Sequence, residues 1–231
     1  MFAEKEYQWT VTKKEQETPD TTSLYLAHDM TRPDFIAGQY LTIKLTDMGP
    51  AEGKAYSISS APHEELLRVT IKKLGTFSSK LLSLSPDDSI TTSDPYGFFY
   101  PDPEDKMPIV FLAGGIGITP IMSIIKSLSH QKDERPLYLL SSNQTNNIVF
   151  ESELEQLQEE NKNLSVQHFV TQENSETHTA RRFNQADLAK LGTPQDAEYF
   201  VCGSADFTKS VWRDLIDQEI PQHQIYTEGF F

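Results

Sequence analysis

Twelve residues near the middle of the chain decide its fold: Ile109-Val110-Phe111-Leu112-Ala113-Gly114-Gly115-Ile116-Gly117-Ile118-Thr119-Pro120. The first five form a continuous apolar run, which is typical of a strand buried on both faces. Three glycines in four positions follow, and apolar residues then recur with helical spacing from Pro120 to Leu128. This order of strand, tight turn and helix predicts a phosphate site, because glycines expose backbone N–H groups and the helix N-terminus carries partial positive charge. Pro120 stands where the G-x-G-x-x-G fingerprint has its third glycine, and a plain tight turn without a ligand is the alternative.

The same unit recurs towards the C-terminus. Further strands are predicted at Leu137–Leu140, Ser165–Val170 and Tyr199–Cys202, and further helices at Glu151–Glu160 and Phe207–Glu219. Strands that alternate with helices imply a parallel, doubly wound α/β sheet.

The first hundred or so residues follow a different pattern. Apolar and polar residues alternate in short segments, among them 7–11, 22–26, 40–45 and 67–71. This alternation predicts antiparallel strands in a small barrel or sandwich, with one short helix over Ser78–Ser85. The polar, proline-rich segment Tyr100–Lys106 is the expected connector, so we divide the chain into domains at 1–103 and 104–231.

Composition and charge exclude several classes of protein. The net charge of −14 and the pI near 4.8 repel nucleic acid and anionic lipid. No apolar run is long enough to span a membrane, and the first residues lack a secretory or transit pattern, so we expect a cytoplasmic protein. Cys202 is the one cysteine, and the six histidines show no metal-site spacing, so no cysteine-ligated cluster and no bound metal are expected. Any electron centre must be an organic cofactor or a metal held by a partner.

Two segments of the N-terminal half carry groups that suit an anionic, planar ligand. Lys54-Ala55-Tyr56-Ser57-Ile58-Ser59-Ser60 places a cation, an aromatic ring and hydroxyl groups on one predicted strand. Gly75-Thr76-Phe77-Ser78 precedes the short helix and can form a second anion-binding helix start, with Ser78 as its cap. Taken alone, the first segment is better explained as an exposed strand, and the second is a helix cap of a common kind. Together with the glycine turn at 114–117, they indicate a flavin and a nicotinamide dinucleotide that meet between the domains.

Eight motifs, in order along nearly the whole chain, resemble those of the ferredoxin–NADP reductase superfamily. They lie at Phe35–Tyr40, Lys54–Ser60, Gly75–Ser78, Pro95–Phe99, Gly115–Pro120, Phe150–Leu154, Tyr199–Gly203 and Tyr226–Phe231. Eight motifs in the family's order are far more specific than any single one. The resemblance implies an N-terminal antiparallel Greek-key β-barrel that binds flavin and a C-terminal α/β domain that binds the nicotinamide nucleotide, in a member without an iron–sulfur domain.

The resemblance also implies roles for individual residues. Tyr56 would stack on the flavin ring, and Ser57 would hydrogen-bond near N5 of that ring. Cys202 and Glu228 would lie beside the nicotinamide, where Cys202 would form a polarisable wall of the pocket and would not act as a nucleophile. The expected catalytic residues are therefore Ser57, Cys202 and Glu228. The other residues expected at the flavin are Lys54, Ala55, Ile71, Lys72, Gly75, Thr76, Phe77 and Ser78. Those expected at the nicotinamide nucleotide are Gly115, Gly117, Thr119, Pro120 and Gly203. The terminal pair Phe230 and Phe231 is expected to stack on the exposed flavin face, with a plain packing contact or a frayed tail as the alternative.

Two departures from the family pattern affect ligand binding. Lys54 stands where the family usually has arginine, so a bidentate grip on the flavin phosphate becomes a point-charge contact. Asn143 stands where many NADPH-specific members place an arginine for the 2′-phosphate. Arg181 and Arg182 could take its place, which leaves NADH and NADPH both open.

By this resemblance the chain is an NAD(P)H-dependent flavoprotein oxidoreductase, and FAD is expected rather than FMN. Its electrons would pass to an external acceptor: a ferredoxin, a flavodoxin, an oxygenase component or a small molecule. An acidic carrier protein would need a local basic patch, for which Lys54, Lys72, Lys73 and Lys80 are the candidates. A flavin-binding electron-transfer or regulatory subunit with little nicotinamide turnover is the alternative, and a nucleotide-binding module without redox chemistry is a third.

Overall fold

The computed structural model describes residues 5–28, 32–45, 49–191 and 196–230. The chain forms two compact units. The first comprises Met1–Tyr100 together with Met122–Ser127, and the second comprises Pro101–Ile121 together with Leu128–Phe231.

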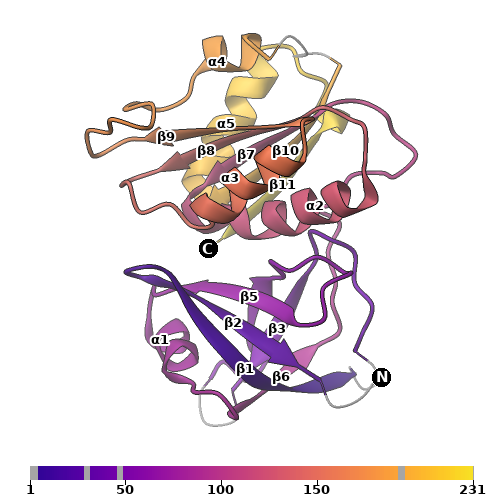
Figure 1. Ribbon diagram of the computed structural model, residues 1–231, viewed down its shortest axis with the longest axis vertical. Helices are drawn as coiled ribbons and strands as arrows, with labels where there is room; N and C mark the ends of the chain where they lie inside the picture. Colours follow the sequence, from indigo (N-terminus) through magenta and orange to yellow (C-terminus); the bar gives the residue numbers. More distant parts are fainter. Residues whose placement is uncertain (1–4, 29–31, 46–48, 192–195, 231) are drawn as a thin grey trace. The chain divides into compact units, whose positions relative to one another are not determined.

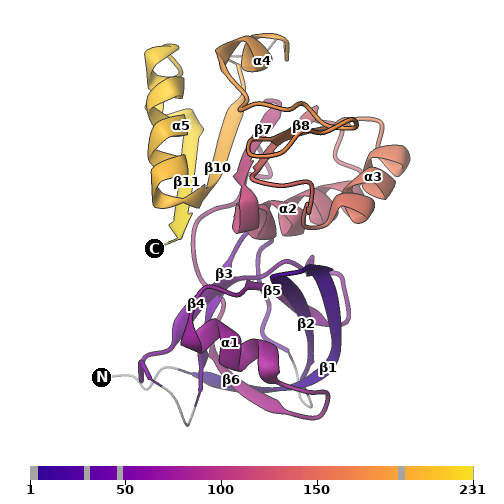
Figure 2. The same cartoon turned by 90° about the vertical axis from the view of Figure 1, so that its left-hand side faces the viewer.

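The first unit is an antiparallel sheet of six strands that curls on itself (Figures 1 and 2). Its elements are β1 (Glu6–Thr18), β2 (Thr21–Ala27), β3 (Tyr40–Lys44), β4 (Lys54–Ser57), β5 (Leu67–Lys72), α1 (Thr76–Ser83) and β6 (Ser89–Ser93). The strand order is β4-β3-β6-β1-β2-β5. Beyond β4, Ile58 bridges to Val69 of β5, and the Ser59 N–H donates to the Arg68 carbonyl at 2.8 Å. This bridge joins the two edges of the sheet, so the predicted antiparallel barrel is confirmed.

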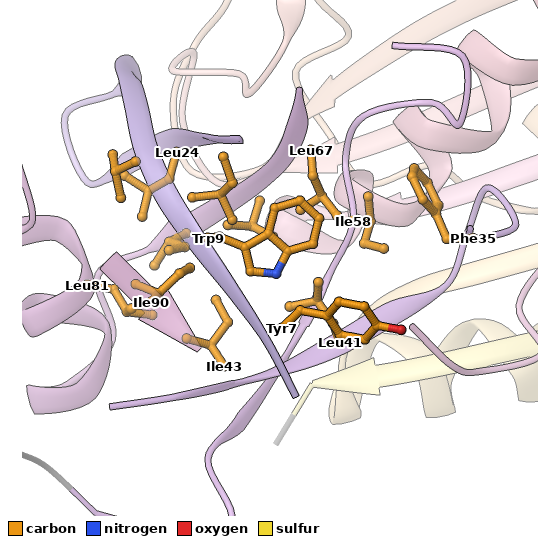
Figure 3. Packing of buried hydrophobic residues seen from close by; sticks show 14 of the residues in the cluster. Tyr7, Trp9, Leu24, Phe35, Leu41, Ile43, Ile58, Leu67, Leu81 and Ile90 are labelled. Atoms are coloured by element: carbon orange, nitrogen blue, oxygen red, sulfur yellow. The ribbon is translucent and has the colours of Figure 1, made fainter. Parts of the chain in front are cut away.

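The barrel core follows directly from the alternation along the strands. On β1, Tyr7, Trp9 and Val11 are buried while the residues between them are more exposed. Trp9 lies among aliphatic side chains such as Leu24 (Figure 3), and its indole N–H donates to Thr92 Oγ1 at 2.8 Å. The bonded indole N–H means that burial of this large side chain leaves no unsatisfied donor.

The second unit is a parallel sheet of five strands with helices against it. Its elements are β7 (Ile109–Gly114), a 3₁₀ turn (Gly115–Gly117), α2 (Ile118–Gln131), β8 (Leu137–Asn143), α3 (Glu151–Glu160), β9 (Leu164–Val170), α4 (Gln185–Ala189), β10 (Glu198–Ser204), α5 (Ala205–Asp217), a second 3₁₀ turn (Gln222–Gln224) and β11 (Ile225–Phe230). The order is β11-β10-β7-β8-β9, and α3 and α5 lie on opposite faces (Figure 2). The chain builds outward from β7 in both directions, which confirms the predicted doubly wound sheet and sets its switch point between β7 and β10. Within the described chain, no helix is both long and apolar enough to cross a membrane.

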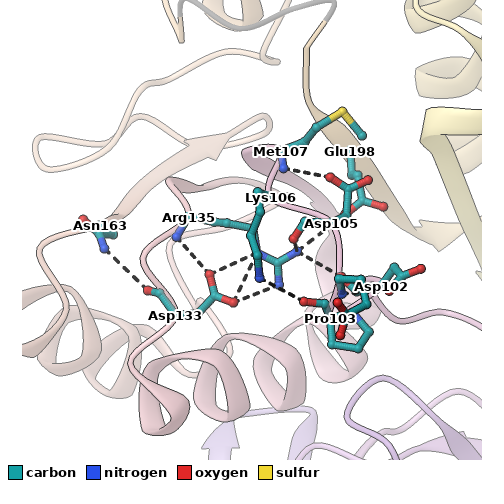
Figure 4. A network of polar contacts seen from close by, with 10 residues as sticks. Asp102, Pro103, Asp105, Lys106, Met107, Asp133, Arg135, Asn163 and Glu198 are labelled. Atoms are coloured by element: carbon teal, nitrogen blue, oxygen red, sulfur yellow. Dashed lines mark hydrogen bonds and ion pairs between the residues drawn. The ribbon is translucent and has the colours of Figure 1, made fainter.

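A buried arginine ties the start of the second unit together. Arg135 makes a two-point contact with Asp133 at 2.9 and 3.0 Å, and donates to the carbonyls of Asp102 and Asp105 at 3.2 and 3.1 Å (Figure 4). Glu198, also buried, lies 3.9 Å from the same guanidinium. The segment that leads into β7 is therefore held by side chains and not only by the chain's connectivity.

Two local expectations were wrong. The short helix begins two residues early, at Thr76, with Gly75 as its N-cap, so Ser78 lies in the first turn and is not the cap. The helix after the glycine turn begins at Ile118 and not Pro120. For Phe230, the alternative of a frayed tail does not hold, because β11 pairs in parallel with β10 up to this residue. Strand β11 has neither an alternating nor a continuous apolar pattern, so only its partner strand identifies it.

The central tryptophan gives a test of the barrel. We expect Trp9→Ala to lower the free energy of unfolding by about 3–5 kcal/mol, because it removes a fully buried side chain and leaves a cavity. Trp212→Ala, in the half-buried second tryptophan on α5, is the control and should cost clearly less. Urea unfolding followed by circular dichroism measures both losses, and equal losses would contradict the central role of Trp9.

Candidate functional site

In the first unit, the predicted flavin motif lies on β4, an edge strand that pairs with β3. Lys54 and Ala55 are exposed, Tyr56 is half-buried and Ser57 is buried. The Ser57 hydroxyl has no hydrogen-bond partner among the described residues. Buried hydroxyls are nearly always bonded, so this oxygen marks a place where a ligand can complete the site. Ser57 shares its face of β4 with Ala55, which lines a cavity of about 430 Å³, whereas Lys54 and Tyr56 lie on the opposite face.

An aromatic pair with a cation lies on the Lys54 and Tyr56 face of β4. The rings of Tyr56 and Phe77 are stacked with centroids 6.4 Å apart and an interplanar angle of 18°. The Lys54 ammonium lies 5.7 Å from the centroid of the Phe77 ring. Burial raises the pKa of Tyr56 to about 12, so its phenol stays neutral at physiological pH. The group offers a flat apolar surface beside a positive charge, which suits an aromatic ligand that carries phosphate.

The turn before α1 offers backbone donors. Gly75 and Thr76 are exposed, and a Cβ at Gly75 would meet nothing within 4 Å. The Ser78 hydroxyl accepts from the N–H groups of Leu74 and Gly75 at 2.9 and 3.0 Å, which closes the turn on itself. The N–H groups of the first helical turn, at Thr76 to Ser78, have no intrahelical partner in an α-helix, and the turn is exposed at Gly75 and Thr76.

The side chains of two other residues predicted at the flavin are less available to bind a ligand. The Ile71 side chain is fully buried in the barrel core. The Lys72 ammonium lies 3.3 Å from an Asp20 carboxylate oxygen, which offsets its charge. Their side chains are therefore engaged elsewhere in the first unit.

In the second unit, the glycine turn packs directly against β10. A Cβ at Gly117 would lie 2.1 Å from the Cys202 carbonyl oxygen, and one at Gly114 would lie 2.7 Å from the Phe207 ring. Gly115 adopts a φ of +53° and opens onto free space. The Thr119 hydroxyl is bonded within the turn, to the Ile116 carbonyl at 3.0 Å. The turn therefore presents backbone N–H groups at the N-terminus of α2, where Pro120 lies in the first turn.

Cys202 and Glu228 are neighbours across β10 and β11, in direct register. Cys202 is fully buried, and this burial, followed by the nearby Glu228, raises the pKa of its thiol well above the usual value. Burial also raises the pKa of Glu228 to about 7, and one oxygen of its carboxyl has no hydrogen-bond partner among the described residues. A neutral thiol is a poor nucleophile but a good apolar surface.

The remaining predicted residues lie at the same ends of these two strands. Gly203 follows Cys202, and a Cβ there would lie 2.6 Å from the Phe207 ring. Phe230 is half-buried at the end of β11, opposite Ser204. Phe231 lies outside the described residues. Phe207, which packs against Gly114 and Gly203, was not predicted, because its position on α5 carries no motif.

Two histidines ten residues apart meet next to Glu151 of α3. The rings of His168 and His178 are edge to face with centroids 5.4 Å apart, and His178 Nε2 lies 2.8 Å from a Glu151 oxygen. Burial lowers the pKa of His168 to about 4, so its ring is neutral. Across the described part of the chain, no three His, Cys, Asp or Glu side chains are grouped closely enough to hold a metal ion.

Comparison with known proteins matches each unit to an oxidoreductase domain. Residues 8–100 match the family described as an oxidoreductase FAD-binding domain, and residues 111–213 match the oxidoreductase NAD-binding domain. The flavohemoprotein of Bacillus subtilis (strain 168) is 32% identical over 240 residues, which are 98% of this chain and 60% of that protein. That of Oceanobacillus iheyensis is 29% identical and is covered over 62% of its length. The chain thus spans about three fifths of these two relatives.

Solved structures share the fold. The FAD/NAD-binding domain of a nitric oxide dioxygenase from Vibrio cholerae matches with a TM-score of 0.88 at 23% identity, over 97% of this chain and 98% of that one. A ferredoxin NADP⁺ reductase from Neisseria gonorrhoeae with bound FAD and NADP matches with a TM-score of 0.84 at 21% identity. The match covers 98% of this chain and 99% of that one.

The buried carboxyl of Glu228 predicts a pH dependence of stability. The folded protein keeps this proton up to about pH 7, whereas the unfolded chain releases it near 4.5. The contribution to stability is therefore complete below about pH 4.5 and lost as the pH rises through 7, by up to about 3 kcal/mol. Glu228→Gln should lack this loss. Its free energy of unfolding, relative to that of the unmodified chain, should therefore increase as the pH rises from about 4.5 to 7.

Urea unfolding at a series of pH values measures the difference. Asp214→Asn, an exposed carboxylate on α5, is the control and should give an offset that does not vary with pH. Parallel curves for Glu228→Gln and the unmodified chain would contradict a raised pKa at Glu228.

Proposed function

The chain belongs to the ferredoxin–NADP reductase superfamily of oxidoreductases, with an FAD-binding and an NAD-binding domain, and we propose that it transfers a hydride from NADH or NADPH to FAD and then passes electrons to an external acceptor. The observation that carries the proposal is the buried Ser57 hydroxyl, which has no partner among the described residues and directly follows Tyr56, whose ring stacks with that of Phe77. FAD, when bound, supplies a ring that accepts two electrons together and can release them singly.

The residues of the first unit fit FAD. We assign the Lys54 ammonium and the N–H groups at the start of α1 to the phosphates, because both supply positive charge at an open surface. Tyr56 gives the flavin ring an apolar face, since its phenol is neutral. Ser57 supplies the hydroxyl that hydrogen-bonds to the ring and so fixes its orientation.

The residues of the second unit fit the nicotinamide nucleotide. The glycine turn offers backbone N–H groups to its phosphates, with Gly115 leaving room for their approach. Cys202 excludes water from the end of β10 without reacting, because its thiol stays protonated. The free oxygen of the Glu228 carboxyl can accept a hydrogen bond from the ligand. We therefore propose that Ser57, Cys202 and Glu228 contact the reacting rings of the two ligands. Gly203, Thr119 and Pro120 would instead maintain the shape of the glycine turn and its surroundings.

The distribution of charge bears on the acceptor. Residues 1–100 carry 14 acidic and 10 basic side chains, whereas residues 101–231 carry 20 acidic and 10 basic ones. An acidic carrier such as a ferredoxin or flavodoxin would meet less repulsion on the flavin-binding unit, where Lys54 and Lys73 are exposed. Lys72 contributes less because Asp20 pairs with it. An oxygenase component or a small molecule needs no such steering, so these acceptors fit equally.

The proposal is tested by the colour of the protein. We expect purified protein to bind FAD and the yellow absorbance to bleach when NADH or NADPH is added without oxygen. Ser57→Ala should keep FAD but slow the bleaching by about tenfold or more, because an orienting hydrogen bond is lost. Ser89→Ala, an exposed serine on β6, is the matched control. A colourless protein that takes up no added FAD would overturn the proposal.

The lysine at position 54 makes a separate prediction about FAD affinity. Lys54→Arg should tighten FAD binding several-fold, since a guanidinium grips phosphate at two points, and Lys54→Ala should weaken it by about tenfold. Lys209→Ala, an exposed lysine on α5, should leave the affinity unchanged. Fluorescence titration of the apoprotein with FAD measures all three, and identical dissociation constants would remove Lys54 from the phosphate site.

A further inference from the structure

We propose that the second unit selects NADH over NADPH. A carboxylate is hydrogen-bonded to the loop after β8, and Arg181 is paired with a different, buried carboxylate. This inference rests on the proposed function and names its electron donor. In a doubly wound sheet the pyrophosphate binds at the first glycine turn, and the adenosine ribose lies at the end of the following strand. Here that strand is β8, which ends at Asn143.

The end of β8 presents neutral groups that are bonded to one another. Asn143 is buried, and its amide donates to Ser141 Oγ at 2.9 Å. The Asn143 carbonyl accepts from both the N–H and the hydroxyl of Thr171, at 2.9 and 3.2 Å. The Gln144 carbonyl accepts from the N–H of Gln172 at 2.9 Å. The loops after β8 and β9 are thus joined by hydrogen bonds, and these bonds bring no cation to the end of β8.

A carboxylate lies where a 2′-phosphate would need a cation. One oxygen of Glu173 accepts from both the backbone N–H and the side-chain amide of Asn146, at 2.9 and 3.0 Å. This contact holds a negative charge against the loop that directly follows β8. A 2′-phosphate brings about two further negative charges and would be repelled, whereas the 2′-hydroxyl of NADH is uncharged and meets no such repulsion.

Arg181 is not available to offset that charge. Its two terminal nitrogens contact the two carboxylate oxygens of Asp187 at 2.6 and 2.7 Å, and the Asp187 side chain is 1% exposed. The same carboxylate accepts from the Asn184 N–H at 2.9 Å and so helps to begin α4. Moving Arg181 to a phosphate would weaken the compensation of a buried charge, which is strongly unfavourable. Arg182 is exposed, and it is the remaining arginine of the pair suggested by the sequence.

The test compares nucleotides that differ only at the 2′ position. Calorimetric titration of the full chain with NAD⁺ and NADP⁺, and with adenosine monophosphate and its 2′-phosphorylated form, gives affinities without turnover. We expect the nucleotides that lack the 2′-phosphate to bind at least about tenfold more tightly at low salt. The ratio of kcat/KM for NADH and NADPH should favour NADH to a similar degree.

Charge variants locate the cause. Glu173→Lys should raise NADP⁺ affinity by about tenfold and change NAD⁺ affinity little, and Glu173→Gln should give part of that gain without a new cation. Glu176→Lys, an exposed acid in the same loop, makes the same change in net charge and should do much less. Circular dichroism and the melting temperature check that each variant folds.

Several outcomes would overturn the inference. The first is that NADP⁺ binds as tightly as NAD⁺. The second is that Glu173→Lys and Glu176→Lys raise NADP⁺ affinity equally. The third is a preference for NADP⁺ that Arg182→Ala abolishes. In each of these cases the chain still uses a nicotinamide nucleotide, so the proposed function stands. Binding of neither dinucleotide, by contrast, would overturn the proposed function itself.

Discussion

The close approach of Gly117 to the Cys202 carbonyl is the constraint on which the second unit depends. A Cβ at Gly117 would lie 2.1 Å from that oxygen, so no other residue fits without moving the backbone of β10. The contact sets the glycine turn against the end of β10, and the register of β10 with β11 then places Glu228 beside Cys202. One steric requirement thus brings the glycine turn, the thiol and the carboxyl together at the carboxyl ends of neighbouring strands, at the switch point of the sheet.

Local sequence patterns predicted most of the fold, because they report burial directly. The apolar run of β7, the glycine turn and the helix after it were correct to within two residues, and the alternation over β1 and β5 correctly predicted a barrel. Strand β11 and the joining of the barrel's edges at Ile58 could not be predicted in this way. Both depend on pairing between segments far apart in sequence, and neither has a distinctive pattern of its own.

The candidate sites were predicted less completely than the fold. Motif resemblance found the residues of β4 and the glycine turn, and the two matched oxidoreductase domains confirm the family and its cofactors. The individual roles of Ser57, Cys202 and Glu228 stay predictions. Sequence gave no signal for the pairing of Arg181 with Asp187, because an arginine in a loop looks the same whether it is free or bound to a buried carboxylate. That pairing is one of the observations from which we propose a preference for NADH.

The two units offer the proposed ligands different kinds of contact, and the difference suits the proposed roles. The first offers a charged side chain, an aromatic face and a hydroxyl without a partner among the described residues, a combination that can retain a cofactor. The second offers the backbone N–H groups of a glycine turn, in the more acidic part of the chain. Net negative charge weakens the binding of an anionic dinucleotide and speeds its release. Fast release suits the proposed nicotinamide donor, which must leave after each turnover. It would not suit a flavin that stays bound.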